Sequence, residues 1–234
     1  MIRYSEITEK NPREIVLLRG RGCRWRRCRF CDYHLDSSKD EEANYELNQE
    51  VLSKVTGKYG SLEVINSGSF CELDAKTMGE IEKVCREKRI SQLRFEAHWM
   101  YREKIKPLKE RFAPGTKVKI KMGVETFEAK FRENVMEKGM GGAEPEEIAR
   151  YADEVCLLFG FKGQTGETME RDIQTGLRYF ERICVNLMNP NTAPLQPDRD
   201  VIRLFLENVY PRYRDNPRAD ILVENTEFGV GGDA

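Results

Sequence analysis

Hydrophobic and polar positions form two kinds of segment along the chain, short apolar runs and longer amphipathic stretches. A short, nearly continuous apolar run is typical of a strand that is buried on both faces of a parallel sheet. Such runs lie at residues 14–20, 62–68, 90–97, 117–125, 154–161 and 182–189. The pattern therefore predicts six buried strands.

Amphipathic stretches with helical spacing follow these strands. The predicted helices cover residues 40–60, 74–89, 100–112, 126–138, 145–152, 167–181 and 198–210. Asp74 precedes its helix in the position of an N-cap residue, and Pro145 suits a first helical turn. Pro107 is expected to kink or split its helix, because proline lacks a backbone N–H donor.

Strands that alternate with helices favour a parallel sheet covered by helices, here with about six βα units. The alternation alone leaves open a doubly wound sheet and a complete or partial barrel. We expect a single domain over residues 1–234, with 1–13 as an N-terminal extension and 211–234 as a C-terminal tail, a candidate cap for a barrel. Residues 219–225 predict either one more strand or an irregular tail.

The composition limits the classes of function. Charged residues make up 34% of the 234-residue chain and the net charge is -1, so the chain as a whole shows no bias towards nucleic acids or membranes. No stretch reaches the roughly 18 apolar residues of a membrane helix. The first residues also lack the basic and apolar regions of a signal peptide. We therefore expect a cytoplasmic protein.

The seven cysteines are unevenly spaced and do not resemble the disulfide framework of a secreted protein. Cys23, Cys28 and Cys31 form a C-x4-C-x2-C pattern within GCRWRRCRFCDYH, residues 22–34. Zinc with His34 as a fourth ligand would make an arginine-rich site for RNA or phosphate. Three cysteines alone suit a four-iron cluster with one open iron. The spacing leaves both metals open, with inert thiols as a third reading.

The other cysteines indicate no second metal site. Cys71, Cys85, Cys156 and Cys184 show no paired spacing, so an auxiliary cluster is not expected. The last three of these are predicted core residues, since an unliganded cysteine behaves as a small hydrophobe. His98 is either a catalytic base or a structural histidine at a strand end.

The unusual residues fall directly after the predicted strands. The cysteine loop, residues 22–34, follows the first strand. The segments after the later strands are NSGSF (66–70), EAHW (96–99), GVET (123–126), GFKGQTGET (160–168) and MNPNTAPLQP (188–197). Ligands bind at the carboxyl ends of the strands in parallel α/β folds, so we expect the chemistry there.

This arrangement resembles the radical S-adenosylmethionine (SAM) superfamily. That family usually carries C-x3-C-x2-C after its first strand, with an aromatic residue before the last cysteine, and Phe30 holds that position. Here the spacing between the first two cysteines is one residue longer. NSGSF resembles the family's glycine-rich motif for the methionine amino group, and GVET its ribose motif. GFKGQTGET resembles its Gly-Pro-Gly-Glu-Thr loop without the proline. The resemblance covers roughly residues 14–210 and implies a partial (β/α)6 barrel.

The resemblance also implies cofactors. Cys23, Cys28 and Cys31 would hold a [4Fe-4S] cluster whose open iron binds SAM. One electron would then cleave SAM reductively to a 5′-deoxyadenosyl radical, a step that the cofactors carry while the protein orients the partners. The implied SAM-binding residues are Phe30, Tyr33, Ser67, Gly68, Ser69 and Glu125. Without the cysteine loop, Ser67–Ser69 would be read as a plain turn and Glu125 as a solvated strand end. No catalytic acid or base is assigned.

Arginines crowd the cysteine loop and its preceding strand end. They are Arg19, Arg21, Arg24, Arg26, Arg27 and Arg29. Some of them can hydrogen-bond to cluster sulfur or to the SAM carboxylate. Others can form a docking face for an acidic electron donor of the flavodoxin or ferredoxin type. A solvated basic loop is the alternative.

The chain has little beyond the core of the family that it resembles, which favours a small-molecule substrate. It most resembles small members that act on a modified 7-deazaguanine base, which predicts cleavage of the C–N bond of queuine with release of preQ1, a lyase reaction. The candidate substrate-binding residues are Glu96, Asn186, Asn189, Glu224 and Glu227. A radical modification of RNA or of a peptide is the alternative. Neither a nucleic acid nor a membrane is the expected partner.

Overall fold

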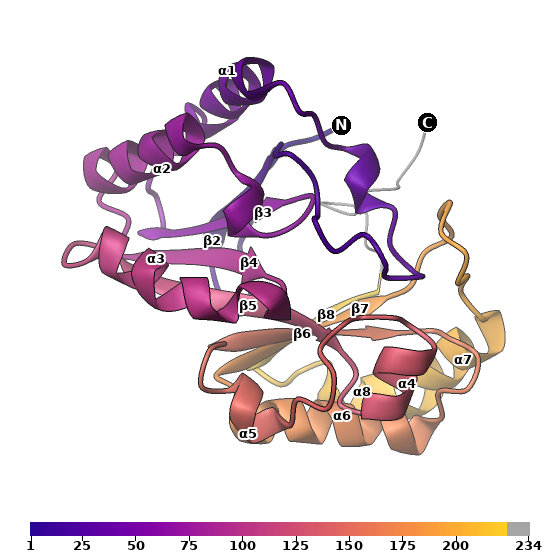
Figure 1. Ribbon diagram of the computed structural model, residues 1–234. Coiled ribbons are helices and arrows are strands. Elements are labelled where there is room, and N and C mark those ends of the chain that lie inside the picture. The colour runs from indigo at the N-terminus through magenta and orange to yellow at the C-terminus, as the bar shows by residue number, and fades with distance from the viewer. Residues whose placement is uncertain (224–234) are drawn as a thin grey trace. The chain divides into compact units, whose positions relative to one another are not determined.

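The computed structural model describes residues 1–223 and shows an α/β fold (Figure 1). Its eight strands follow one another in the sheet in chain order, from β1 to β8. β1 runs antiparallel to β2, whereas the β2–β3, β3–β4, β5–β6, β6–β7 and β7–β8 pairs are parallel. The predicted α/β class with a parallel sheet is therefore confirmed.

The chain divides into two compact units. Unit 1 comprises Met1–Arg24 and Tyr33–Ile120, and unit 2 comprises Trp25–Asp32 and the segment that starts at Lys121. The cysteine loop therefore contributes residues to both units, with Cys23 in unit 1 and Cys28 and Cys31 in unit 2.

Unit 1 holds the first four strands and the start of the fifth. Its elements are β1 (Tyr4–Ile7), β2 (Arg13–Leu18), η1 (Tyr33–Leu35), α1 (Glu41–Leu52), β3 (Ser61–Asn66), η2 (Phe70–Glu72), α2 (Ala75–Glu87), β4 (Gln92–Ala97), η3 (Trp99–Lys104), α3 (Ile105–Phe112) and the first residues of β5 (Lys117–Glu125). Every residue of β2 and β3 is buried, as their apolar runs predict. Helices α1 and α2 pack together (Figure 1).

Unit 2 holds the rest of β5 and the last three strands. Its other elements are α4 (Ala129–Asn134), α5 (Pro145–Ile148), β6 (Glu154–Phe159), α6 (Gly166–Tyr179), β7 (Arg182–Leu187), α7 (Arg199–Leu204), the π-helical η4 (Phe205–Val209), α8 (Tyr210–Tyr213) and β8 (Ala219–Leu222). Helix α6 packs against β6 and β7 (Figure 1). The strand reading of residues 219–225 is thus confirmed for Ala219–Leu222.

Two local predictions about helix ends are confirmed. The Asp74 side chain accepts a hydrogen bond from Thr77 N at 2.7 Å, so it caps α2 and satisfies a backbone donor of the first turn. Pro107 lies in the first turn of α3, and the preceding residues Trp99–Lys104 form the separate 3-10 helix η3. The predicted helix over 100–112 is therefore split.

Other segments differ from prediction. The helix expected over 126–138 is limited to α4, because the chain turns back after it and the buried Arg132 guanidinium bonds to the carbonyls of Gly141 and Ala143 at 3.1 and 2.9 Å. The strand β1 was not predicted, since its four half-buried residues form no continuous apolar run. No helix within residues 1–223 is long and apolar enough to cross a membrane.

Candidate active site

In unit 1, Cys23 lies against the loop that follows β3. Its backbone N donates to Ser67 O at 3.1 Å. A Cβ on Gly68 would come within 3.1 Å of both N and Cα of Cys23. Only a glycine therefore fits between this loop and the first cysteine. The structure thus brings the predicted cluster residue Cys23 together with the predicted SAM-binding residues Ser67 and Gly68.

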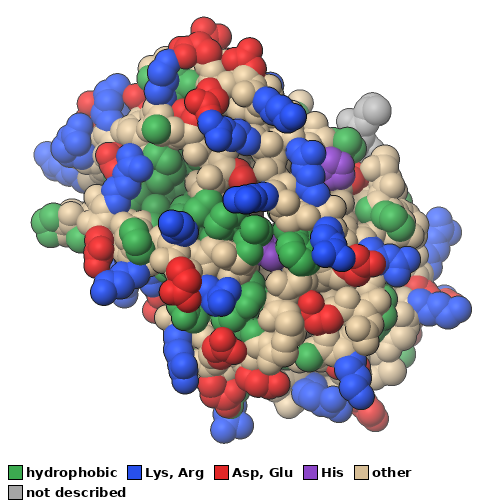
Figure 2. Space-filling view, in the orientation of Figure 1, with side chains coloured by type: hydrophobic (Ala, Val, Ile, Leu, Met, Phe, Trp, Pro, Cys, Tyr) green, Lys and Arg blue, Asp and Glu red, His purple; other side chains and the backbone are tan. Residues whose placement is uncertain are grey.

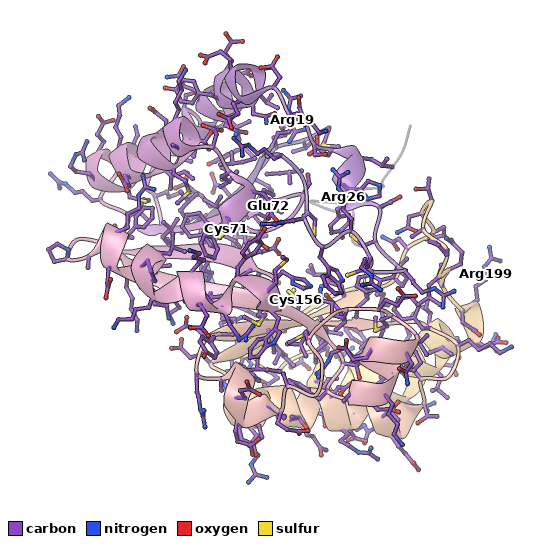
Figure 3. All side chains as sticks on the ribbon, in the orientation of Figure 1. Arg19, Arg26, Cys71, Glu72, Cys156 and Arg199 are labelled. Carbon is purple, nitrogen blue, oxygen red and sulfur yellow. The ribbon has the colours of Figure 1, made fainter. Side chains whose placement is uncertain are left out.

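Glu72 organises this part of the site, although the sequence analysis did not select it (Figure 3). The carboxylate is 5% exposed. It accepts hydrogen bonds from Ser69 N, from Arg24 N at 3.1 Å and from Tyr101 Oη at 2.8 Å. Burial and this bond to Glu72 raise the pKa of Tyr101. A local signal existed, because Ser69-x-x-Glu72 is a capping-box sequence.

Ser69 and Ser67 connect this loop to its surroundings. Ser69 Oγ accepts a hydrogen bond from His98 N at 2.8 Å, just after the end of β4. His98 is buried, and its Nδ1 accepts from Met100 N at 3.2 Å, which favours the structural reading of this histidine. Ser67 Oγ donates to Asp36 O. The predicted SAM-binding residue Tyr33 lies in η1 and is exposed.

In unit 2, Cys28 and Cys31 sit against an apolar cluster. Cys31 N donates to Cys28 O at 3.3 Å, so the segment forms a turn. Both cysteines pack on a buried group of Phe30, Phe131, Met136, Leu158, Phe161 and Met188. The ring centres of Phe30 and Phe161 are 6.1 Å apart. The aromatic residue before the last cysteine is therefore a core residue that fixes the turn.

Two backbone segments hold the unit 2 part of the cysteine loop. In the turn after α4, Glu137 O accepts a hydrogen bond from Trp25 Nε1 at 2.9 Å. Met136 O, in the same turn, accepts one from Arg29 N at 3.0 Å. From the other segment, the loop after β7, Asn191 Nδ2 donates to Phe30 O at 2.8 Å. The geometry of residues 25–32 is thus fixed by segments distant in sequence.

Asp32 presents a buried carboxylate beside Cys31. Its Oδ2 accepts from Thr192 N and Thr192 Oγ1, both at 3.0 Å. Its Oδ1 is buried and has no hydrogen-bond partner within residues 1–223. An unsatisfied buried carboxylate oxygen is costly, so this position suits a ligand that donates a hydrogen bond. No sequence motif marked Asp32 as a site residue.

Glu125 and Lys138 form a buried ion pair close to the same cysteines. Lys138 Nζ lies 2.7 Å from Glu125 Oε1. Burial alone would lower the pKa of Lys138. The charges of Glu125, Cys28 and Cys31, with the hydrogen bond to Glu125, outweigh burial and raise this pKa above its ordinary value. The predicted SAM ligand Glu125 is therefore a partner of a lysine that sequence motifs did not indicate.

The glycine-rich loop after β6 is closed by a glutamine. Gln164 Oε1 accepts from Gly160 N and Phe161 N at 2.9 and 3.0 Å, and Gln164 Nε2 donates to Leu158 O at 3.1 Å. Gly160 and Gly163 have φ of 113° and 102°, which glycine adopts without strain. Three hydrogen bonds of one side chain therefore connect the two ends of this loop.

The predicted substrate residues are only partly placed. Asn186 is half-buried on β7 in unit 2, and Asn189 is exposed in the loop that follows. Glu96 is half-buried on β4 in unit 1. Glu224 and Glu227 lie outside the described residues. The substrate-binding assignments stay predictions.

The arginines of the cysteine loop divide by role. Arg19 bonds to the helix α1, with Nε 2.7 Å from Asn44 Oδ1, so it is structural. Arg21 pairs with Glu41. Arg21 is exposed, as are the arginines of the loop itself, namely Arg24, Arg26, Arg27 and Arg29. Figure 2 shows Lys and Arg side chains interspersed with acidic ones on the visible face.

The remaining cysteines follow the sequence analysis in part. Cys85 and Cys184 are buried, as predicted for core residues, whereas Cys156 is only half-buried. Cys71 is exposed (Figure 3). Among residues 1–223, no three His, Cys, Asp or Glu side chains form a group that could hold a metal ion. Ligation of a cluster by Cys23, Cys28 and Cys31 therefore stays a prediction.

Comparison with known proteins gives a full-length match among solved structures. No family model matches the sequence, and no curated protein matches it. A solved structure of queuine lyase from Clostridium spiroforme, bound to SAM and queuine, matches with a TM-score of 0.94 and 43% identity over 100% of both chains. The spore cortex-lytic enzyme SleL from Bacillus cereus matches with a TM-score of 0.36 and 11% identity, over 71% of this chain and 47% of that one. We base no argument on this second likeness.

The full-length likeness confirms the predicted fold class and the resemblance read from the cysteine loop. The α/β fold, the C-x4-C-x2-C loop and the glycine-containing turn beside Cys23 define the class, that of radical SAM enzymes. At 43% identity over the whole of both chains, the chain belongs to the queuine lyase family.

Proposed function

We propose that this chain is a radical SAM lyase that acts on queuine. It would break the C–N bond between the cyclopentenediol and the aminomethyl base and release preQ1. The observation that carries the proposal is the full-length likeness to a lyase bound to SAM and queuine. This likeness also favours an iron–sulfur site over the zinc reading, in which His34 was a fourth ligand.

The chemistry of the donor residues suits a [4Fe-4S] cluster and SAM. Cys23, Cys28 and Cys31 would supply the thiolates that hold the cluster, which would provide the one-electron reduction of SAM. A buried ammonium near Cys28 and Cys31 offsets negative charge there. Gly68 lies close to Cys23 and presents a backbone surface without a side chain.

The resemblance of the sequence motifs to those of the radical SAM family supports the remaining roles. The Ser67–Ser69 backbone binds the methionine end of SAM, and Glu125 accepts from the ribose hydroxyls. Phe30 and Tyr33 contribute to the SAM site. Glu96, Asn186 and Asn189 are candidates for the donors and acceptors of the 7-deazaguanine edge and the diol. Glu224 and Glu227 belong to the same candidate set.

The reductant is a small acidic protein of the flavodoxin or ferredoxin type. Exposed arginines on the unit 2 part of the cysteine loop, such as Arg26 and Arg27, offer it a basic docking face. We place the protein in the cytoplasm, where a reducing environment keeps cysteines out of disulfides, in line with the absence of any disulfide among the described cysteines from Cys23 to Cys184.

Anaerobic reconstitution tests this function. The protein should take up about four irons and four sulfides, as one cluster requires. With dithionite, SAM and queuine it should form preQ1 and 5′-deoxyadenosine, and serine at Cys23, Cys28 and Cys31 should abolish both products. Bulk tRNA is the competing substrate. Modified tRNA without preQ1, together with tRNA binding that weakens steeply with salt, would defeat the lyase assignment.

A further inference from the structure

Lys138 is a buried charged residue in unit 2 whose surroundings point to a specific role. Its side chain and that of Glu125 are each 10% exposed, and the Nζ–Oε1 distance is 2.7 Å. Nζ also lies 5.6 Å from the centre of the Phe30 ring, within the cysteine loop. Cys28 and Cys31 pack on the same apolar cluster as Phe30. One ammonium thus pairs with a predicted SAM ligand and lies beside the ring that separates two predicted cluster ligands in the sequence.

The backbone around Lys138 is fixed from both sides. Lys138 N donates to Arg132 O at 3.1 Å, and the Arg132 side chain is fully buried. The next residue, Gly139, lies under Trp25, because a Cβ there would come within 2.1 Å of the Trp25 ring. The ammonium is therefore held in place by the fold rather than by the ion pair alone.

The strand end is shaped to receive this ammonium. The register of β5 against β6 shifts between Gly123 and Glu125, and Glu125 has a φ of 69°, an unusual value for a residue other than glycine. A Cβ on Gly123 would come within 2.9 Å of Lys138 Nζ and 2.7 Å of Glu125 Oε1. The bulge and the missing side chain together make room for the pair.

We propose that Lys138 is a positioning residue for both cofactors, orienting Glu125 towards the SAM ribose and placing a fixed positive charge beside the thiolates of Cys28 and Cys31. By holding Oε1 of Glu125, the lysine directs the other carboxylate oxygen to a ligand. A fixed positive charge near the cluster favours its reduced form and raises its midpoint potential. The inference rests on the proposed function of this site.

Four variants test the two parts of this role. Lys138→Met removes the charge, Lys138→Arg keeps it, and Lys138→Met combined with Glu125→Gln removes one charge of each sign. Lys130→Met is the matched control, since Lys130 is an exposed lysine of α4 in the same unit. After anaerobic reconstitution, iron content, the midpoint potential from a redox titration followed by electron paramagnetic resonance, and the SAM Kd are measured for each.

The expected pattern follows the charge. Lys138→Met lowers the midpoint potential and weakens SAM binding about tenfold, the scale of a lost charge-assisted contact. Lys138→Arg restores the potential. The double variant returns the potential towards that of the wild type but leaves SAM binding weak. Lys130→Met changes neither quantity.

A buried unpaired Glu125 can prevent Lys138→Met from folding, so a second comparison avoids that variant. The double variant and Glu125→Gln alone differ only in the charge at position 138, and the double variant should show the lower potential. Equal potentials in these two proteins, at equal iron content, would overturn the proposal. A wild-type protein that binds neither cluster nor SAM would instead contradict the proposed function.

Discussion

Replacement of Gly68 by alanine should destabilise the protein, because the space next to this glycine is already filled. A Cβ at this position would lie 2.7 Å from Glu72 Oε2 and 3.1 Å from both N and Cα of Cys23. The Glu72 carboxylate cannot easily move, since it accepts from Ser69 N, Arg24 N and Tyr101 Oη. The Cys23 atoms belong to the backbone and are equally constrained.

The size of the effect follows from the cost of overpacking. Forcing one extra carbon into a well-packed site usually costs about 1–3 kcal/mol of unfolding free energy. A contact of 2.7 Å to a held carboxylate places Gly68→Ala in the upper half of that range. Gly79 in α2 is the matched control, because a Cβ there meets no described atom within 4 Å apart from its chain neighbours and the backbone of its own helix. Gly79→Ala should stabilise by roughly 0.5–1 kcal/mol through helix propensity.

Urea unfolding of the reduced, metal-free proteins, followed by circular dichroism, measures both changes. Gly68→Ala should unfold at lower urea than the wild type, and Gly79→Ala at higher urea. After reconstitution, Gly68→Ala should also hold less iron, because its added carbon displaces Cys23. A Gly68→Ala protein as stable as the wild type, with full iron content, would refute the close packing inferred for this loop.

Two further predictions concern buried polar groups in unit 2. Burial raises the pKa of Asp172 to about 6. Ionisation of this carboxyl therefore lowers the free energy of unfolding as the pH rises from about 4 through 6, by up to about 3 kcal/mol. In Asp172→Asn the amide oxygen can still accept from Phe127 N. In urea unfolding, the stability of this variant relative to the wild type should therefore be greater at pH 7 than at pH 4. A stability difference between the two proteins that is independent of pH would contradict this. Gln164→Ala removes three hydrogen bonds within the glycine-rich loop and should lower thermal stability by about 3 kcal/mol, and an unchanged Tm would show that the loop does not depend on them.

Much of the fold could be predicted because the buried strands are apolar almost throughout. The first predicted strand, 14–20, corresponds to β2 at Arg13–Leu18, and the N-cap Asp74 marks the start of α2. The strand β1 escaped prediction because it is short and half-buried. The helix over 126–138 was predicted too long, because its shortening depends on Arg132 reaching backbone carbonyls on the far side of a turn.

The candidate site likewise contains residues that could be predicted from the sequence and residues that could not. Cys23, Cys28, Cys31 and Gly68 could be selected because their spacing and their place after strands are properties of the sequence. Lys138 could not, since its importance arises only from contacts with Glu125 and the cysteine loop. Three residues of the site have interaction partners that only the fold brings near, namely Asp32, Glu72 and Lys138. Of these three, only Glu72 carried a local signal, the capping box with Ser69.

Hydrogen transfer from queuine to SAM-derived 5′-deoxyadenosine tests the central claim most directly. Queuine deuterated on its cyclopentenediol is incubated with reduced, reconstituted protein and SAM, and the products are analysed by mass spectrometry. The account predicts that deuterium appears in 5′-deoxyadenosine together with released preQ1, and that neither occurs in the protein with serine at Cys23, Cys28 and Cys31. Unlabelled 5′-deoxyadenosine with intact queuine, from a protein that holds a full cluster, would contradict it.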